Sequence, residues 1–269
     1  MTYKKLAQAM RQYSRTDDLC KSGLGVEGSR IRENVILTPG WTPERVSGLG
    51  EAKLVSASGP LYGITVWEIN VDGQGITYIK TGCGAPPVMD ALLSLGETGC
   101  KRVLFLSSIG GLAPEMEVGD LVLPEYSVSG DGASRYLTDG FEDTLGEKAY
   151  PDPELFARLR EETQAMRASE NLRWHLGRPF CEDTLLAQFH HIPDILARGC
   201  NTLDMESAVA FRAGALMGLP VAALQCVSDN SLAKKSLLGG VSGEEQARRN
   251  YVRGQVIPVI LKNLFKSLA

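Results

Sequence analysis

The sequence lacks any apolar run long enough to cross a bilayer. Its longest runs, residues 220–227 and 256–261, fall far short of the ~20 residues that a membrane-spanning helix needs. It has no apolar leader behind its first charged residues, only three histidines, and six cysteines without a CxxC pair. These shortages argue against a secreted disulfide framework and against a zinc or histidine-based metal site. We therefore expect a cytoplasmic protein that holds no metal.

The charges show no bias that would define a polyanionic partner. The net charge is −4 with a pI near 5.5, and the lysines and arginines are scattered along the chain. Neutralising nucleic-acid phosphates or anionic lipids needs clustered positive charge, so neither a nucleic acid nor a membrane is an expected partner. With 43% hydrophobic and 22% charged residues, the 269-residue chain can bury one sizeable core, which favours small-molecule chemistry.

Short β-rich runs alternate with helical segments along the chain. Strands are predicted at 35–37, 52–57, 62–70, 75–80, 102–107, 119–124, 174–180, 200–204 and 221–227. Helices are predicted at 4–15, 87–98, 153–168, 205–217 and 243–266. Ser242 and Glu245 have the spacing of a capping box at the start of the last helix. This alternation predicts one α/β domain, with three α/β/α layers around a central mixed sheet.

The first 30 residues are interpreted separately from the rest. Residues 1–30 are predicted to form a helical extension that ends in a glycine-rich linker at 23–28, and residues 31–269 form the α/β domain. The linker spells GLGVEG, which matches the GxGxxG pattern of dinucleotide-binding loops. That pattern needs a strand before it and a helix after it, whereas here a strand follows, so the match is attributed to chance.

Several strand ends carry glycine or hydroxyl groups, and ligands of such sheets collect at the carboxyl ends of strands. After the first strand, TPGWTPER places Arg45 a few residues beyond Gly40. A guanidinium there is either an anion ligand or an ordinary surface arginine at a helix start. TGCGAPP at 81–87 and SSIGGL at 107–112 would let the backbone approach a ligand closely.

Two acidic residues follow the last predicted strands. Glu206 opens a helix, where a carboxylate can contact a ligand or merely interact favourably with the helix dipole. Asp229 ends an apolar strand, where burial could let its carboxyl hold a proton near neutral pH. From the residues alone, a catalytic and a structural role stay open for both.

Taken in this order, the segments resemble the nucleoside phosphorylase family, which includes uridine phosphorylases, hexameric purine nucleoside phosphorylases and methylthioadenosine nucleosidases. The resemblance spans roughly residues 34 to 265. It is carried by PGWTPERV, TGCGAPP, SSIGGLAPEMEVGDLVLPEYSVSGDGAS, CEDT, DMESA and VSD. It implies a central mixed sheet that is partly closed into a barrel, and a reaction that breaks the N-glycosidic bond of a nucleoside.

The resemblance also implies a role for each matching position. These are the general acid at purine N7, Asp229; the ribose site, Glu206, Met205 and Cys83; the phosphate site, Gly40, Arg45 and Ser108; and the base site, Phe180, Cys181 and Asp183. The Gln/Arg pair that binds uracil in uridine phosphorylases has no counterpart, so purine nucleosides are the expected substrates. No cofactor is implied beyond inorganic phosphate as co-substrate, and the expected assembly is a homodimer or a dimer-based hexamer.

Two departures from the family pattern concern the acceptor. Phe105 holds the position of the second phosphate arginine, and no arginine lies near residues 58–59 to be lent to a neighbouring subunit. A single guanidinium would then meet the phosphate. Family nucleosidases lack these arginines too, use water, and place a water-activating glutamate where Glu44 or Arg45 falls. Phosphorolysis is the expected reaction, with hydrolysis through Glu44 or a catalytically silent nucleoside-binding protein as alternatives.

Overall fold

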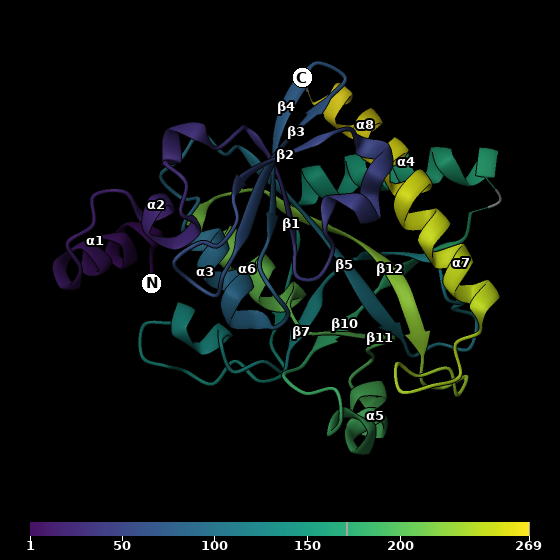
Figure 1. Ribbon diagram of the computed structural model, residues 1–269. Helices are drawn as coiled ribbons and strands as arrows, with labels where there is room; N and C mark the ends of the chain where they lie inside the picture. The colour runs from purple at the N-terminus through teal and green to yellow at the C-terminus, as the bar shows by residue number, and fades with distance from the viewer. Residues whose placement is uncertain (171, 269) are drawn as a thin grey trace.

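A mixed β-sheet forms the centre of the computed structural model, which describes residues 1–170 and 172–268. Within those residues the sheet has twelve strands, and helices cover both of its faces (Figure 1). The strands are β1 (Asn34–Thr38), β2 (Ala52–Ser56), β3 (Thr65–Val71), β4 (Gln74–Lys80), β5 (Arg102–Gly111), β6 (Leu121–Pro124), β7 (Ser127–Ser129), β8 (Lys148–Ala149), β9 (Trp174–Gly177), β10 (Pro179–Cys181), β11 (Thr202–Asp204) and β12 (Val221–Asn230).

Eight α-helices and four 3₁₀ or π-helical turns are found in the same described residues. The α-helices are α1 (Tyr3–Tyr13), α2 (Leu19–Leu24), α3 (Ala85–Leu93), α4 (Pro153–Glu170), α5 (Gln188–Ala197), α6 (Ser207–Met217), α7 (Gly243–Tyr251) and α8 (Ile257–Ser267). The turns are η1 (Gly28–Arg30), η2 (Pro43–Leu49), η3 (Ser134–Leu137) and η4 (Val252–Val256). Across residues 1–170 and 172–268, no helix combines the length and apolar character that crossing a membrane requires.

β5 is the strand at which the sheet branches. Its first half pairs in parallel with β1, its last two residues pair antiparallel with β11, and β12 runs parallel along its other edge. From β12 the pairing continues to β6 and then to β9, which leads one residue later into β10, the partner of β11. The strands thus return to β5 and close a barrel, while β1 to β4 form an open wing. The prediction of a mixed, partly barrel-like sheet is confirmed.

Alternating side chains of the central strands supply two cores, one on each face. In β1, Val35 and Leu37 pack with residues of α3 and α6, whereas Ile36 packs with residues of α4 and α8. Figure 1 shows α3 and α6 on one side of the sheet and α4, α7 and α8 on the other. Phe105, on β5, is fully buried in the α3–α6 core. The three-layer α/β/α prediction is therefore confirmed.

The C-terminal helix differs from the continuous α-helix that the sequence predicts. Its start does follow the prediction, because the Ser242 side chain accepts the Glu245 N–H and the Glu245 carboxylate accepts the Ser242 N–H. Between α7 and α8, however, the residues of η4 form a π-helical turn without a break in the helical backbone. Such turns are rare and occur frequently at functional sites.

The glycine-rich stretch at 23–28 also differs from the predicted linker. Gly23 and Leu24 belong to α2, and Leu24 is fully buried. A Cβ added to Gly23 would lie 2.1 Å from the Ser94 side-chain oxygen, so α2 packs directly beside the end of α3. Glycine is needed at position 23 for this close approach, not for flexibility.

Candidate functional site

A cavity of about 330 Å³ opens at the carboxyl ends of the parallel strands β1, β5 and β12. Open α/β sheets bind small ligands at this edge, and the volume falls in the range of small-molecule sites. The lining combines the turns after these strands with β11, the start of α6 and the C-terminal helix. The structure gathers the following sequence-predicted residues there: Gly40, Arg45, Cys83, Ser108, Met205, Glu206 and Asp229.

Glu206 occupies the N-cap position of α6 and turns its side chain toward the TGCG loop. Its Oε1 atom accepts the Gly84 N–H at 2.7 Å, and only 5% of the residue is exposed. Gly84 has a φ of 101°, a backbone conformation that favours glycine, which explains the residue type in this loop. Burial and the nearby charge of Asp204 raise the pKa of Glu206 to about 8. The carboxyl is therefore mostly protonated at neutral pH.

Asp229 lies just past a shift in the register between β12 and β5. Such an irregularity can redirect a side chain that would otherwise follow the alternation of the strand. The residue is 6% exposed, and its Oδ1 accepts the Ser228 hydroxyl at 2.6 Å. Burial raises the pKa of Asp229, and the Ser228 hydroxyl, the Leu237 N–H and Arg249 oppose that rise. Asp229 is thus a buried acid that lines the same cavity as Glu206.

Asp204 lines this cavity as well, and sequence reasoning assigned it no role. Its Oδ2 accepts the Gln225 side-chain amide at 2.8 Å and the Ser207 N–H at 3.2 Å. The same amide also donates to Ser107 Oγ at 2.8 Å, so one hydrogen-bond chain joins β11, β12 and β5. Burial raises the pKa of Asp204 to about 6. Asp204 stands two residues before Glu206 in the DMES segment, and this proximity is the signal by which sequence reasoning could have found it.

A second group of lining residues surrounds Ser108 and includes two arginines. At Ser108, the Oγ atom accepts the Trp41 indole N–H at 3.2 Å and an Arg253 N–H at 2.8 Å. The Arg253 guanidinium carbon also lies 4.7 Å from the Trp41 ring centroid, a cation–π contact. Gly40 and Arg45 line the cavity beside them. The three residues predicted to bind phosphate therefore line one cavity together with an arginine from the C-terminal helix.

Arg249 and Arg253 are lining residues that sequence reasoning missed. They stand four positions apart on α7 and the π turn, a spacing that places side chains on one helical face. In the sequence this pattern is indistinguishable from a solvated helix face, because nothing in it shows which side meets the cavity. Three arginines, Arg45, Arg249 and Arg253, therefore line the cavity, where sequence reasoning placed one.

The segment predicted to bind the base contributes different residues from those expected. Phe180, Cys181 and Asp183 lie outside the cavity lining, whereas Glu182 and Gln188 are part of it. Cys181 is fully buried, which fits the alternation of a strand that sends neighbouring side chains to opposite faces. Burial, together with the charges of Asp204 and Asp183, raises the pKa of Glu182 to about 8.

Glu44 and Arg45 are neighbours on η2, but only Arg45 lines the cavity. The Glu44 side chain is exposed, and hydrogen bonds with the Thr42 side chain and its own backbone lower its pKa. Consecutive residues of a 3₁₀ turn point about 120° apart, so one of the two must face away. The structure therefore does not bring Glu44 to the site.

The buried carboxyls predict a fall in stability as pH rises. Folded Glu206 and Glu182 hold their protons to about pH 8, whereas the unfolded chain releases them near the ordinary glutamate pKa of 4.5. Between these values the folded state binds more protons, so the free energy of unfolding falls with pH, by at most about 1.4 kcal/mol per pH unit for each group. Urea unfolding at several pH values would measure this slope.

The matched variants for this measurement are Glu206→Gln and Glu182→Gln, each of which should flatten the pH slope. Glu44→Gln serves as the control, because that side chain is exposed and its pKa is lowered, not raised. If the double variant Glu206→Gln/Glu182→Gln kept the wild-type slope of the free energy of unfolding against pH, the assignment of the two protons to these residues would be contradicted.

Comparison with known proteins places the chain in a family. Residues 36–250 match the phosphorylase superfamily. Uridine phosphorylase of Salmonella typhimurium is 33% identical over 73 residues, which cover 27% of this chain and only 29% of that relative. Guanosine phosphorylase of Halorubrum lacusprofundi is 25% identical over 223 residues, which cover 82% of this chain and 87% of that protein.

A solved structure shows the same fold. Uridine phosphorylase of Vibrio fischeri ES114, in complex with 6-hydroxy-1-naphthoic acid, superposes with a TM-score of 0.71 at 19% identity. The superposition covers 97% of this chain and 100% of that one, so the mixed sheet and its flanking helices are shared. The family match extends over most of the chain and includes all but one of the lining segments described above. The chain therefore belongs to the phosphorylase superfamily, as a member of its nucleoside phosphorylase family.

Proposed function

We propose that this protein is a phosphorylase that cleaves the N-glycosidic bond of purine nucleosides with inorganic phosphate as the acceptor. One observation carries the proposal: a single cavity is lined by the buried carboxyls of Glu206 and Asp229 and by three arginines. The carboxyls suit a neutral leaving group and a sugar, and the arginines suit an oxyanion. The similarity to a guanosine phosphorylase over most of both chains supports a purine substrate.

In the proposed reaction, each of the two carboxyls acts on a different part of the nucleoside. A phosphate oxygen forms a bond to C1′ while the bond from C1′ to N9 breaks, and the electron pair of that bond passes to the base. Asp229 transfers its proton to N7, so the purine leaves as a neutral molecule. Glu206 hydrogen-bonds the ribose hydroxyls, a contact that strengthens as the sugar becomes oxocarbenium-like. The products are the free base and ribose 1-phosphate.

The placement of Glu44 supports phosphate over water as the acceptor. A nucleosidase needs a base that activates water at C1′, and the residue predicted for that role lies outside the cavity lining. The arginines that line the cavity would instead stabilise an anionic nucleophile.

The test is base release from inosine, guanosine, adenosine and uridine with and without phosphate, with ribose 1-phosphate measured directly. Phosphate-dependent cleavage of a purine nucleoside is the expected result. Cleavage at the same rate without phosphate would make the protein a nucleosidase, and binding without turnover would make it a silent relative. Uridine belongs in the panel because the Gln188 amide lines the cavity and could contact a pyrimidine.

Proton transfer to N7 predicts a specific failure with 7-deazapurine nucleosides. These analogues keep the shape of the substrate but have a carbon in place of N7, so Asp229 has no atom to protonate. They are expected to bind with affinities close to those of their parents and to be cleaved about 10²–10⁴-fold more slowly. Inhibition constants and single-turnover rates would measure both effects, and cleavage at the rate of the parent nucleoside would exclude acid catalysis at N7.

A further inference from the structure

Arg253 carries a buried positive charge that no carboxylate in the described residues neutralises. The residue is 3% exposed, its guanidinium contacts the Ser108 hydroxyl and the Cys226 thiol, and its Nε has no hydrogen-bond partner. The charged side chains near it include two further arginines, Arg45 and Arg249, which repel it. A hydroxyl and a thiol do not neutralise a buried guanidinium, and an unneutralised buried charge is costly, so an anion bound beside Arg253 would offset that cost.

We propose that Arg253 and Arg249, from the C-terminal helix, bind the acceptor oxyanion together with Arg45 and Ser108. This inference rests on the proposed function, because it names inorganic phosphate as the ligand of that same site. On β5, the position that the resemblance assigns to a second phosphate arginine carries the buried Phe105. The two helix arginines would supply that positive charge instead.

The hydrogen bonds at Ser108 leave its own hydroxyl hydrogen available. A serine hydroxyl has one donor and two acceptor lone pairs. Both acceptor positions are used, one by the Trp41 indole N–H and one by Arg253. The hydroxyl hydrogen must therefore point elsewhere, and within the described residues it meets no acceptor. A phosphate oxygen in the cavity that Ser108 lines would accept it.

Arg249 likewise retains donors for a ligand. Its Nη1 donates to the Ser228 carbonyl oxygen at 3.2 Å, and its buried Nε has no hydrogen-bond partner. Because Ser228 precedes Asp229, this contact brings the Arg249 guanidinium close to the proposed acid. Ser228 of β12 thus links Arg249, which would bind the acceptor, to Asp229, the proposed acid.

Backbone packing brings the two arginine-bearing segments together. A Cβ added to Gly48 of η2 would lie 2.8 Å from the Gly254 carbonyl oxygen in the π turn. A Cβ added to Gly254 would in turn lie 3.8 Å from the Arg45 carbonyl oxygen. Glycine at position 48 therefore allows the segments that carry Arg45 and Arg253 to touch directly.

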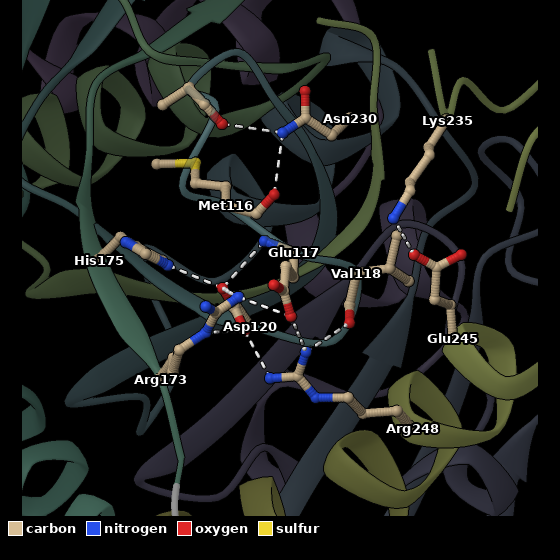
Figure 2. A network of polar contacts seen from close by, with 11 residues as sticks. Met116, Glu117, Val118, Asp120, Arg173, His175, Asn230, Lys235, Glu245 and Arg248 are labelled. Atoms are coloured by element: carbon tan, nitrogen blue, oxygen red, sulfur yellow. Dashed lines mark hydrogen bonds and ion pairs between the residues drawn. The ribbon is translucent and has the colours of Figure 1, made fainter. Parts of the chain in front are cut away.

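A network of ion pairs fixes α7, the helix that carries Arg249. Figure 2 shows Arg248, Arg173 and His175 converging on Asp120, whose side chain is fully buried. The Arg248 Nη2 atom lies 2.6 Å from Asp120 Oδ1, and the His175 Nε2 atom lies 2.8 Å from Oδ2. Asp120 also accepts the Glu117 N–H at 3.0 Å, and these four contacts anchor the helix one residue before Arg249 through residues that do not line the cavity.

Phosphate binding in the absence of nucleoside tests the inference. Titration calorimetry and thermal unfolding would compare the wild type with Arg253→Gln and Arg249→Gln, and with Arg160→Gln, an exposed arginine on α4, as the control. We expect each cavity variant to lose roughly 10- to 150-fold in phosphate affinity, as loss of a hydrogen bond to a charged group predicts. Nucleoside affinity should stay within about 3-fold, and Arg160→Gln should match the wild type.

Thermal unfolding supplies a readout that a purely structural arginine would not give. Arg253→Gln removes an unneutralised buried charge, so its Tm in phosphate-free buffer should equal or exceed that of the wild type. Phosphate should raise the Tm of the wild type and change that of the variant little. If Arg253→Gln does not fold, Arg253→Lys keeps the charge and loses the planar fork, and is expected to bind phosphate more weakly.

The outcomes separate this inference from the proposed function. Phosphate affinity that is unchanged in both cavity variants overturns the inference, even if the wild type shows phosphate-dependent turnover. Stabilisation by a nucleoside 5′-monophosphate but not by inorganic phosphate also overturns it, since the anion would then belong to a nucleotide. Phosphate binding that is lost in the variants upholds the site, even if the wild type turns over no nucleoside and the proposed function fails.

Discussion

Asp229→Asn is expected to lower kcat for a purine nucleoside by about 10²–10⁴-fold, the usual contribution of a positioned general acid. Asparagine has the same shape and can still accept the Ser228 hydroxyl, but it has no proton to transfer. A ribose with a p-nitrophenol leaving group needs no protonation, so its cleavage should change by less than about 3-fold. Comparison of the two substrates in one variant separates loss of the acid from general damage to the cavity.

The pH profile gives a second measurement on the same group. Burial raises the pKa of Asp229, so its acid form persists above the usual aspartate range, and kcat should fall as pH rises through that value. Ser228→Ala removes a hydrogen bond to the ionised carboxylate, which raises the pKa further and should move the falling limb to higher pH. An equal loss with both leaving groups, or a limb that Ser228→Ala leaves in place, would count against Asp229 as the acid.

Glu206→Gln is expected to lower kcat/KM for a ribonucleoside by at least about 100-fold. Above about pH 8, where the Glu206 carboxyl is ionised, each of its hydrogen bonds to the two sugar hydroxyls contributes about 1.5–3 kcal/mol, so the comparison is made at that pH. Glutamine keeps an acceptor for the Gly84 N–H, so the loop should stay in place, whereas Glu206→Ala would leave that buried N–H unpaired. Catalytic loss in the glutamine variant would thus reflect the charge, not the fold.

The control for Glu206 is a change in the substrate. A 2′-deoxynucleoside lacks one hydroxyl that the carboxyl would hold, so the wild type should cleave it more slowly than the ribonucleoside. In Glu206→Gln the difference between the two sugars should shrink toward 1-fold. Undiminished discrimination in the variant would show that the sugar is recognised by other groups.

Strand-end motifs predicted much of the site, because backbone constraints leave traces in the sequence. The glycines of TGCG, the apolar run before Asp229 and the DMES segment at the start of α6 all mark places where strands end. Parallel strands β1, β5 and β12 end at one edge, so residues far apart in sequence converge there. The three-layer arrangement could also be predicted, because the two-residue period of a strand and the 3.6-residue period of a helix can be recognised in a short stretch of sequence.

The missed features depend on tertiary orientation, which leaves weaker traces. Arg249 and Arg253 lie on a helix whose cavity-facing side is set by the π turn, and no local pattern announces such a turn. Glu182 and Gln188 line the cavity where Phe180, Cys181 and Asp183 were expected, because the motif does not show which side chains around the end of β10 face inward. Helix α5 escaped prediction because Pro193 lies inside it, where proline normally indicates a helix end.

Because of the π turn at Val252–Val256, the position of Arg253 and the packing of α8 both depend on the number of residues in this segment. A π turn closes hydrogen bonds over five residues where an α-helix uses four, so it amounts to one inserted residue. Deletion of one residue there would rotate one side of the helix against the other by about 100°. Either Arg253 would leave the cavity, or the apolar side of α8, with Ile260 and Leu261, would turn away from the sheet. Relatives that lack the insertion should therefore lack this guanidinium as well, and would have to recruit the positive charge from another element.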